Sequence, residues 1–307
     1  MSTGAMRRRS AGIAVIALAA SLLLPRVAAA LTVTDDRGVA VELAQPADRV
    51  VSLAPFITEL VFAVGAGSRL VAVSEHSDYP AAARELPRIG NAFSVQLERL
   101  LAASPDLVLS WQTGIDPRVV QRLESMGIPV FVLEPRDIDA VASALRRIGR
   151  LLGTAEAAER AAKRFSATGD EIRKQYADRP TVSVFYQISA QPIMTLNGRH
   201  MVSAVLALCG ATNVFADLGP IAPSVNREQV LARDPEVILI STRGGRPSPQ
   251  VEAWRRYDAI TAVRYDNVYT VDGDLLNRQT PRLLDGARTV CAILDRARER
   301  LARPESR

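Results

Sequence analysis

The chain has 307 residues, of which 48% are apolar and 23% are charged, and its formal net charge is +5. This length allows one large core or two ordinary ones, and this balance of apolar and charged residues excludes a largely disordered chain. The segment 1–30 holds four arginines and no acid, so the remainder carries a net charge of only +1, which does not favour a nucleic-acid partner.

The segment 1–30 has the pattern of a secretory signal peptide. Arginines at 7–9 precede an apolar run over 13–24, and the alanines at 28–30 suit a signal peptidase. The run is shorter than the roughly 20 residues that cross a bilayer, although a retained N-terminal anchor is an alternative. We expect an exported, periplasmic protein of a bacterium whose mature chain starts near Leu31.

The first half of the mature chain predicts a hairpin followed by an α/β lobe. Residues 31–48 alternate apolar and polar side chains around a DDRG turn, which is typical of a hairpin. From 49 to 152, short apolar stretches alternate with segments of helical periodicity, which predicts a parallel sheet covered on both faces. The expected strands are 49–55, 69–74, 106–111 and 128–135, and the expected helices are 56–67, 97–104, 118–127 and 137–153.

The second half predicts a connecting helix and a second lobe. Residues 153–178 have helical spacing but few large apolar side chains, and such a helix would span roughly 35 Å. The alternation then restarts over 179–303, with Thr280 and Pro281 as the expected cap and first turn of the final helix. The expected strands are 181–189, 236–241 and 267–272, and the expected helices are 201–210, 227–235, 253–261 and 281–302.

One helix–strand unit occurs twice. Residues 97–111 align without a gap with 227–241, and the match pairs Glu98 with Glu228 and Pro105 with Pro235. This repeat favours an α/β fold of two similar lobes with mostly parallel sheets, joined by a single long helix, with the ligand cleft between the lobes. Ligands bind at the carboxyl ends of strands in such sheets, so the loops after the strands of both lobes are the candidate site.

Other chemistries are poorly supported. The chain lacks a Gly-rich phosphate loop and a nucleophile elbow, and His76, Ser77 and Asp78 are adjacent and cannot face one another as a triad requires. An enzyme is therefore the weaker class. A zinc or manganese carrier would need about four converging ligands, whereas only His76, His200 and Asp274 are available, so no intrinsic metal or cofactor is expected.

The sequence resembles, over nearly all of the mature chain, the cobalamin-binding proteins of periplasmic ABC importers, and more loosely the haem and iron-siderophore carriers of the same build. The segments that carry the resemblance are RVVSLAPFITELVFAVGA at 49–66, SDYP at 77–80, 97–111, REQVLARDP at 227–235 and DLLNRQTPR at 274–282. The resemblance implies a monomeric, non-catalytic carrier of cobalamin or another corrinoid, with haem or a ferric siderophore as the alternative. It also implies that Glu98 and Glu228 dock onto the two halves of an inner-membrane permease.

The resemblance further implies a slot that grips a flat macrocycle. Trp111 matches a family tryptophan, Asp274 and Arg278 match an acid and a base at the corrin periphery, and His76 replaces a family tyrosine. An imidazole there could be an axial ligand of cobalt or haem iron. Two further family tryptophans are missing near Ala92–Phe93 and Ile221–Ala222. The ligand-binding residues expected are Phe56, His76, Phe93, Trp111, Ile221, Asp274, Leu275, Leu276, Asn277 and Arg278.

The two cysteines, Cys209 and Cys291, both lie in the second lobe. In an oxidising compartment a single pair is most simply one disulfide, with two buried free thiols as the alternative. The resemblance also implies the disulfide, because the family has paired cysteines at matching positions.

Overall fold

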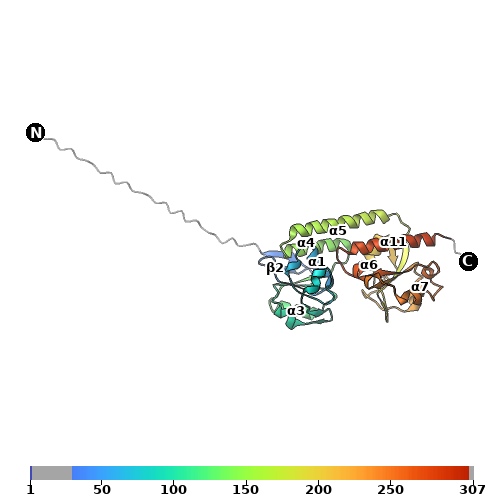
Figure 1. The fold of residues 1–307 in the computed structure, drawn as a ribbon, viewed down its shortest axis with the longest axis horizontal. Coiled ribbons are helices and arrows are strands. Elements are labelled where there is room, and N and C mark those ends of the chain that lie inside the picture. The colour runs from blue at the N-terminus through green and yellow to red at the C-terminus, as the bar shows by residue number, and fades with distance from the viewer. Residues whose placement is uncertain (2–29, 304–307) are drawn as a thin grey trace.

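The computed structural model describes Met1 and residues 30–303, and the predicted signal peptide therefore lies almost wholly outside the described residues. Two α/β lobes lie side by side, with α5 (Ala155–Tyr176) running along both of them (Figure 1). The N-terminal lobe contains four main strands and four helices: β3 (Val50–Ser52), β4 (Leu70–Val73), β7 (Leu107–Trp111), β8 (Val130–Leu133), α1 (Pro55–Ala63), α2 (Leu97–Ala102), α3 (Pro117–Ser125) and α4 (Ile138–Leu151).

The C-terminal lobe repeats this design. Its main strands are β9 (Val182–Gln187), β12 (Ala211–Asn213), β13 (Val237–Thr242) and β14 (Val268–Asp272). Its helices are α6 (Met201–Leu208), α7 (Arg227–Arg233), α8 (Pro249–Trp254), α9 (Thr261–Arg264), α10 (Gly273–Leu276) and α11 (Leu283–Leu301). Two small hairpins, β5 (Gly90–Asn91) with β6 (Ser94–Val95) and β10 (Ser189–Ala190) with β11 (Ile193–Met194), complete the two lobes.

Both four-stranded sheets are parallel throughout and have the same strand order. The order is β4-β3-β7-β8 in the N-terminal lobe and β12-β9-β13-β14 in the C-terminal lobe. In each lobe the second strand in sequence therefore lies at one edge of the sheet, beside the first. The third and fourth strands follow on the other side of the first. This confirms the expected pair of similar lobes with parallel sheets.

The repeated helix–strand unit has the same local structure in both lobes. Ser104 and Asp234, which are equivalent in the repeat, both follow their helix with the backbone in the left-handed region, at φ of 46° and 38°. Two residues further on, the Asp106 carboxylate accepts hydrogen bonds from the backbone amides of Asp48 and Arg49, just before β3. The equivalent Glu236 accepts from the backbone and hydroxyl of Ser183 in β9. The repeat therefore encodes one way of fixing a helix to the start of a central strand.

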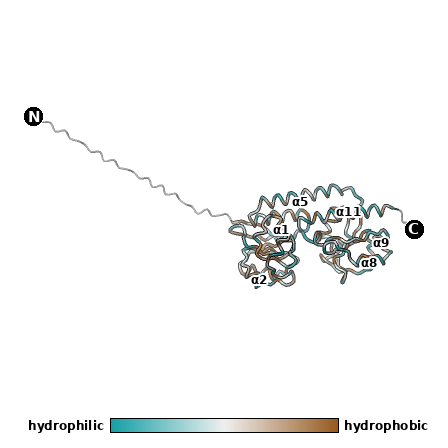
Figure 2. Tube along the Cα trace, viewed as in Figure 1, coloured by the Kyte–Doolittle hydropathy of each residue, from teal (hydrophilic) through white to brown (hydrophobic). Residues whose placement is uncertain are grey.

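The helices on one side of the sheets join the lobes into one body. A continuous apolar cluster includes residues of α1, α4, α5, α6 and α11 and one face of each sheet, and hydrophobic residues gather inside both lobes (Figure 2). Alternate residues of β7 show the two-sided burial of a parallel sheet, because Leu107 and Leu109 belong to this cluster whereas Val108 belongs to a separate one. The opposite face of the second sheet has its own cluster around Phe185.

The predicted N-terminal hairpin is present as β1 (Leu31–Thr34) paired with β2 (Ala40–Leu43). Its turn carboxylates attach it to the first lobe: Asp35 accepts from the backbone amide of Val132, and Asp36 accepts from that of Glu134. Asp36 also pairs with Arg147 of α4 at 2.7 Å. The acidic pair at 35–36 is therefore a structural clamp on β8.

The predicted disulfide is also present, between Cys209 and Cys291, with the Cα atoms 4.9 Å apart. Cys209 ends α6 and Cys291 lies within α11, so the bond ties two helices of the C-terminal lobe that cover the same face of its sheet. Within the described residues, none of the helices is both long enough and apolar enough to cross a membrane.

Two local expectations need correction, and one main strand was not predicted. The expected helix over 253–261 is instead mostly turn, because α8 begins earlier, at Pro249 after the capping Ser248, and α9 begins only at Thr261. Thr280 does not cap the final helix, which begins at Leu283, and its buried hydroxyl has no hydrogen-bond partner. The short polar strand β12 was not expected, because ATN lacks the apolar pattern of a buried strand.

Candidate ligand-binding site

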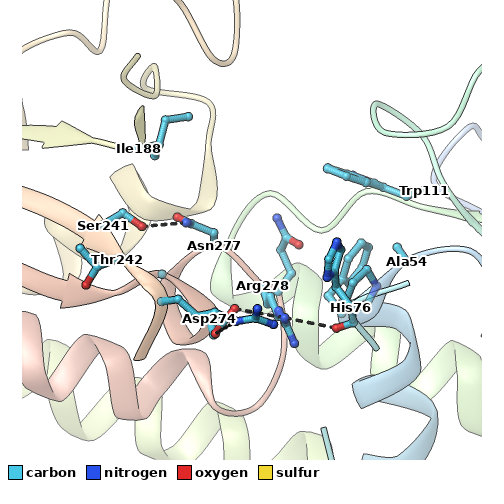
Figure 3. A pocket seen from close by; sticks show the side chains of 14 residues that line it. Ala54, His76, Trp111, Ile188, Ser241, Thr242, Asp274, Asn277 and Arg278 are labelled. Atoms are coloured by element: carbon cyan, nitrogen blue, oxygen red, sulfur yellow. Dashed lines mark hydrogen bonds and ion pairs between the residues drawn. The ribbon is translucent and has the colours of Figure 1, made fainter. Parts of the chain in front are cut away.

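An open cavity of about 470 Å³ lies where the carboxyl ends of the two sheets face each other. Figure 3 shows Ala54, His76 and Trp111 on one side and Ile188, Ser241, Thr242 and Asn277 on the other, with Asp274 and Arg278 between them. The loops expected from the sequence to hold the site thus supply it. The remaining lining residues are Pro55, Phe56, Arg243, Gly273 and Gln279.

The N-terminal lobe supplies an aromatic wall. Trp111 ends β7 and packs edge-to-face on Phe56 of α1, with ring centroids 5.9 Å apart. Phe56 is buried and Trp111 is partly exposed, so the buried ring supports the exposed one. Gly114 is required beside it, because a Cβ at that position would lie 1.7 Å from the indole ring. Trp111 thus offers a supported indole to the cavity.

His76 lies in the loop after β4, with its backbone in the left-handed region at φ 64°. A chain of buried hydroxyls holds the following residue: Thr58 donates to Ser52, Thr58 and Ser77 are 3.0 Å apart, and Ser77 is within 3.2 Å of Ser74. Ser77 is fully buried in this chain. It is therefore a structural residue, and the His76 imidazole is left exposed at the cavity.

The C-terminal lobe supplies a polar wall. The amide of Asn277 donates to the hydroxyl of Ser241 at 3.1 Å, and its oxygen accepts from the hydroxyl of Tyr186 at 3.0 Å. Burial raises the pKa of Tyr186, although hydrogen bonds to Ser241 and Asn277 lower it in part, so this phenol stays protonated as a donor. The orientation of the Asn277 side chain is thereby fixed by two partners behind it.

An ionic cluster lies at one edge of the cavity. Arg278 donates to Glu59 at 2.9 Å, to Asp78 at 3.1 Å and to Asp274 at 3.1 Å. Arg243 pairs with Asp78 at 3.0 Å. Burial alone would raise the pKa of Asp78, but the hydrogen bond and charge of Arg278 outweigh it, so that pKa is lowered and the carboxylate is ionised at neutral pH.

Arg282 completes this cluster from the start of α11. Its Nε and Nη2 atoms donate to the two oxygens of Glu59, at 2.9 and 2.7 Å, and its guanidinium lies 3.7 Å from the ring centroid of Tyr79. The cluster contains three arginines and three carboxylates, so its formal charges cancel: Arg243, Arg278 and Arg282 against Glu59, Asp78 and Asp274.

Six of the ten residues expected to bind a ligand line the cavity: Phe56, His76, Trp111, Asp274, Asn277 and Arg278. The other four do not line it. Leu276 is only 1% exposed and belongs to the apolar core. Ile221 lies in a loop, where its backbone carbonyl accepts a hydrogen bond from the backbone amide of Asn197. Leu275 is partly exposed beside Gly286, and Phe93 is fully exposed at the tip of the β5–β6 hairpin. Ligand binding by all ten stays a prediction.

The two candidate docking residues occupy equivalent places. Glu98 and Glu228 are both in the first turn of their helices, α2 and α7, and both are exposed. Within the described residues neither carboxylate has an ion pair or hydrogen-bond partner. They are therefore free to meet a partner, and the pairing of Glu98 and Glu228 with a permease stays a prediction.

No group of three or more His, Cys, Asp or Glu side chains suited to a metal ion occurs in the part of the chain that the structure describes. His200 lies away from the cavity lining and caps α6, because its Nδ1 accepts from the backbone amide of Val202 at 3.1 Å. Burial lowers the pKa of His200 to about 4. The ligand set of His76, His200 and Asp274 is thus not assembled.

Sequence reasoning missed several residues of the site. Ser241 and Thr242 end β13 and Arg243 follows it, at an edge of the sheet expected to face the cleft, but their residue types gave no further signal. Glu59 was missed altogether, because it lies inside a predicted helix. The only available sign was a charged residue in an otherwise apolar helical segment, PFITELVFA.

Comparisons with known proteins identify a family and relatives of the same fold. Residues 50–275 match the family model described as "Periplasmic binding protein". The chain is 38% identical over 249 residues to the vitamin B12-binding protein of Vibrio cholerae, covering 81% of this chain and 90% of that protein. The crystal structure of the periplasmic vitamin B12-binding protein of Vibrio cholerae matches with a TM-score of 0.77 and 37% identity, over 83% of this chain and 99% of that one.

A haem-binding protein is also similar. The crystal structure of a periplasmic haem-binding protein from Pseudomonas aeruginosa has a TM-score of 0.70 and 26% identity, over 80% of this chain and 92% of that one.

Proposed function

Because the chain belongs to the periplasmic binding protein family, we propose that it captures cobalamin or a related corrinoid and delivers it to an inner-membrane ABC transporter. The observation that carries this proposal is the cavity between the lobes, in a chain 38% identical to a vitamin B12-binding protein. Its chemistry is that of a binding protein, in which the ligand leaves unaltered.

The two walls of the cavity support a flat macrocycle edged with amides. Trp111, backed by Phe56, offers an apolar surface to the plane of a macrocycle. Opposite, Ser241, Asn277 and Arg243 offer donors and acceptors that suit peripheral amides. A corrinoid presents both kinds of surface.

The ionic cluster favours a corrinoid over haem. Haem carries two propionates, which are best bound by arginines with free donors. Here Arg278 already donates to three carboxylates, and the charges of the whole cluster cancel. An amide-bearing corrinoid needs no surplus positive charge, so this balance supports cobalamin as the ligand and makes haem the second candidate.

Delivery would use the paired acids of the two lobes. Glu98 and Glu228 are exposed, without partners among the described residues, and lie on equivalent helices of a repeated unit. A permease made of two related halves would present two similar basic pockets to such a pair. Reversing both charges, by Glu98→Lys and Glu228→Lys, is expected to abolish complex formation with the permease while ligand affinity stays unchanged.

Export to the periplasm would use the segment 1–30 as a signal peptide, and the carrier would act there as a monomer. The disulfide between Cys209 and Cys291 fits an oxidising compartment. Mass spectrometry of the protein purified from the periplasm is expected to find an N-terminus near Leu31. A chain that retains the segment 1–30 in the membrane fraction would argue for an anchor instead.

His76 is exposed at the cavity and is the candidate axial ligand of a bound metal centre. Axial coordination by its imidazole would alter the visible spectrum of a bound corrinoid or haem. If the spectrum of the complex is the same in His76→Ala, the imidazole does not coordinate the metal.

The main test is a calorimetric and spectroscopic titration with cyanocobalamin, dicyanocobinamide and haemin. We expect cyanocobalamin to bind at one saturable site per chain and to be recovered chemically unaltered. Binding of haemin alone would replace the corrinoid by haem, and chemical conversion of the ligand would contradict a carrier.

A further inference from the structure

Glu59 is a buried carboxylate that contacts the opposite lobe. It lies in α1 of the N-terminal lobe, and its side chain is 2% exposed. Both of its cationic partners, Arg278 and Arg282, belong to the C-terminal lobe. A buried carboxylate needs such partners, because an unpaired buried charge is strongly unfavourable. Glu59 therefore depends on the two lobes being close together.

Several hydrogen bonds connect the two lobes around Glu59. Six hydrogen bonds of the cluster join the lobes, from Arg243, Arg278 and Arg282 to Glu59, Asp78 and the backbone oxygen of His76. The N-terminal lobe supplies only acceptors here, and the C-terminal lobe supplies all the donors. Opening the lobes at this edge would break the bonds together, because Arg282 holds both oxygens of Glu59 and Arg278 holds one of them as well.

From this geometry we infer that Glu59 is a positioning residue that sets the width of the cleft in the ligand-free protein. It does so by holding the start of α11 and Arg278 against α1. The α5 helix and the shared apolar core join the lobes along one side, whereas the Glu59 cluster joins them at the edge of the cavity. With both connections in place, the two walls are held facing each other before any ligand arrives.

Glu59 also fixes the direction of Arg278. The Arg278 side chain is 11% exposed, and its guanidinium is held by Glu59 and Asp78 from one lobe and by Asp274 from its own. Loss of Glu59 would remove one anchor from Arg278 and the whole carboxylate partner of Arg282, which would keep only its contact with the Tyr79 ring. The lobes would then be free to separate at this edge.

The test measures the distance between the lobes directly, without ligand. Spin labels are attached through non-natural amino acids at Gln121 in α3 and Ala232 in α7, which are exposed positions in different lobes, so the native disulfide is left intact. Pulsed electron paramagnetic resonance then gives the distance distribution. We expect one narrow peak for the parent protein, and a distribution broadened towards longer distances in Glu59→Gln.

The matched control is Glu159→Gln. That carboxylate also contacts two cations, Arg146 and Lys163, but all three lie in α4 and α5, away from the cleft. Its distribution is expected to equal that of the parent. Equal broadening in Glu159→Gln, or a folded Glu59→Gln with the parent distribution, would overturn the inference.

Asp78→Asn gives a second route if Glu59→Gln does not fold. Asp78 joins Arg278 and Arg243 across the cleft and is 35% exposed, so the change should be tolerated, and a smaller broadening is expected. An unchanged distribution in Asp78→Asn, where Glu59→Gln is unfolded, overturns the inference. Because no ligand is present, these outcomes do not depend on whether the protein binds a corrinoid.

Discussion

The two lobes share one sheet topology, yet they present different chemistry to the cleft. In the N-terminal lobe, Phe56 at the start of α1 and Trp111 at the end of β7 line the cavity, and the side chains that this lobe adds to the ionic cluster are carboxylates. In the C-terminal lobe the equivalent region offers Ser241, Asn277 and the arginines 243 and 278. The same framework therefore places the two walls opposite each other, and the residues at the strand ends give each wall its own chemistry.

The lobes also differ in the contacts that stabilise each of them internally. The C-terminal lobe has a disulfide between two covering helices, and the N-terminal lobe has instead the β1–β2 hairpin attached through Asp35 and Asp36. The repeat unit itself, by contrast, is fixed in the same way in both, through Asp106 and Glu236. Variants made in one lobe at a time can therefore show which contacts stabilise both lobes and which stabilise only one.

The largest effect is expected for the disulfide. Replacing Cys209 and Cys291 together by Ala opens a loop of 82 residues, which should lower the free energy of unfolding by about 4 kcal/mol. Urea unfolding of the variant and the parent measures this difference. If the loss is under about 1 kcal/mol, the C-terminal lobe does not depend on its cross-link, and the contrast with the N-terminal lobe fails.

The aromatic wall should matter for affinity more than for stability. Trp111→Ala is expected to weaken cyanocobalamin binding by about 100-fold, corresponding to the ~2–3 kcal/mol of a well-packed aromatic contact. Gly114→Ala should weaken it by about tenfold, because the new Cβ displaces the indole. Calorimetry measures both changes. Unaltered affinity in Trp111→Ala would remove the N-terminal lobe from the binding surface.

The first helix after the first strand differs between the lobes in its cap. His200 caps α6, and burial lowers its pKa to about 4 from an ordinary 6.5; the equivalent α1 has no side-chain cap. Below pH 6.5 the unfolded chain binds a proton that the folded chain does not, so stability falls as pH decreases from 6.5 towards 4. The ring is partly exposed, and solvent reduces the effect of its burial. We therefore expect the free energy of unfolding to fall by about 2 kcal/mol over this range.

His200→Asn is the matched control for this titration, because an asparagine keeps a capping acceptor but has no charge change. The free energy of unfolding of the parent minus that of His200→Asn should therefore decrease between pH 7 and pH 4. A difference that is constant over this range would show that His200 keeps an ordinary pKa.

The smallest effect is expected at the repeated helices. Asn226 forms a capping box with Gln229 at the start of α7, whereas Gln96 at the start of α2 makes no cap bond. Asn226→Ala should therefore cost about 1 kcal/mol of stability and Gln96→Ala close to nothing. Thermal unfolding of the pair measures the contrast, and equal losses would mean that the cap does not distinguish the two lobes.

The framework could be predicted because its signals are local. Apolar alternation and proline positions placed most strands and helices, and the repeat at 97–111 and 227–241 predicted the twin lobes. The prediction failed where the local signal was weak or misleading. The α8 helix begins at Pro249, after the capping Ser248, rather than within the apolar–basic segment 253–261, and the Thr280–Pro281 pair precedes its helix without capping it.

The site could be predicted only in part for a different reason. Trp111, Asp274 and Arg278 follow from family motifs and lie at the cavity. Glu59 could not be found in this way, because its role arises from arginines of the opposite lobe, which are far from it in the sequence. Leu276 sits within a binding motif but points into the core, which shows that a motif identifies a loop more reliably than the direction of each side chain.

The most direct measurement uses the only two tryptophans of the chain, Trp111 and Trp254. Trp111 lines the cavity, whereas Trp254 is 3% exposed in the C-terminal core. In Trp254→Phe, Trp111 becomes the sole indole reporter, and titration with cyanocobalamin should quench its fluorescence to saturation at one ligand per chain. If cyanocobalamin gives no saturable quenching at ligand concentrations well above micromolar, the cleft does not hold a corrinoid.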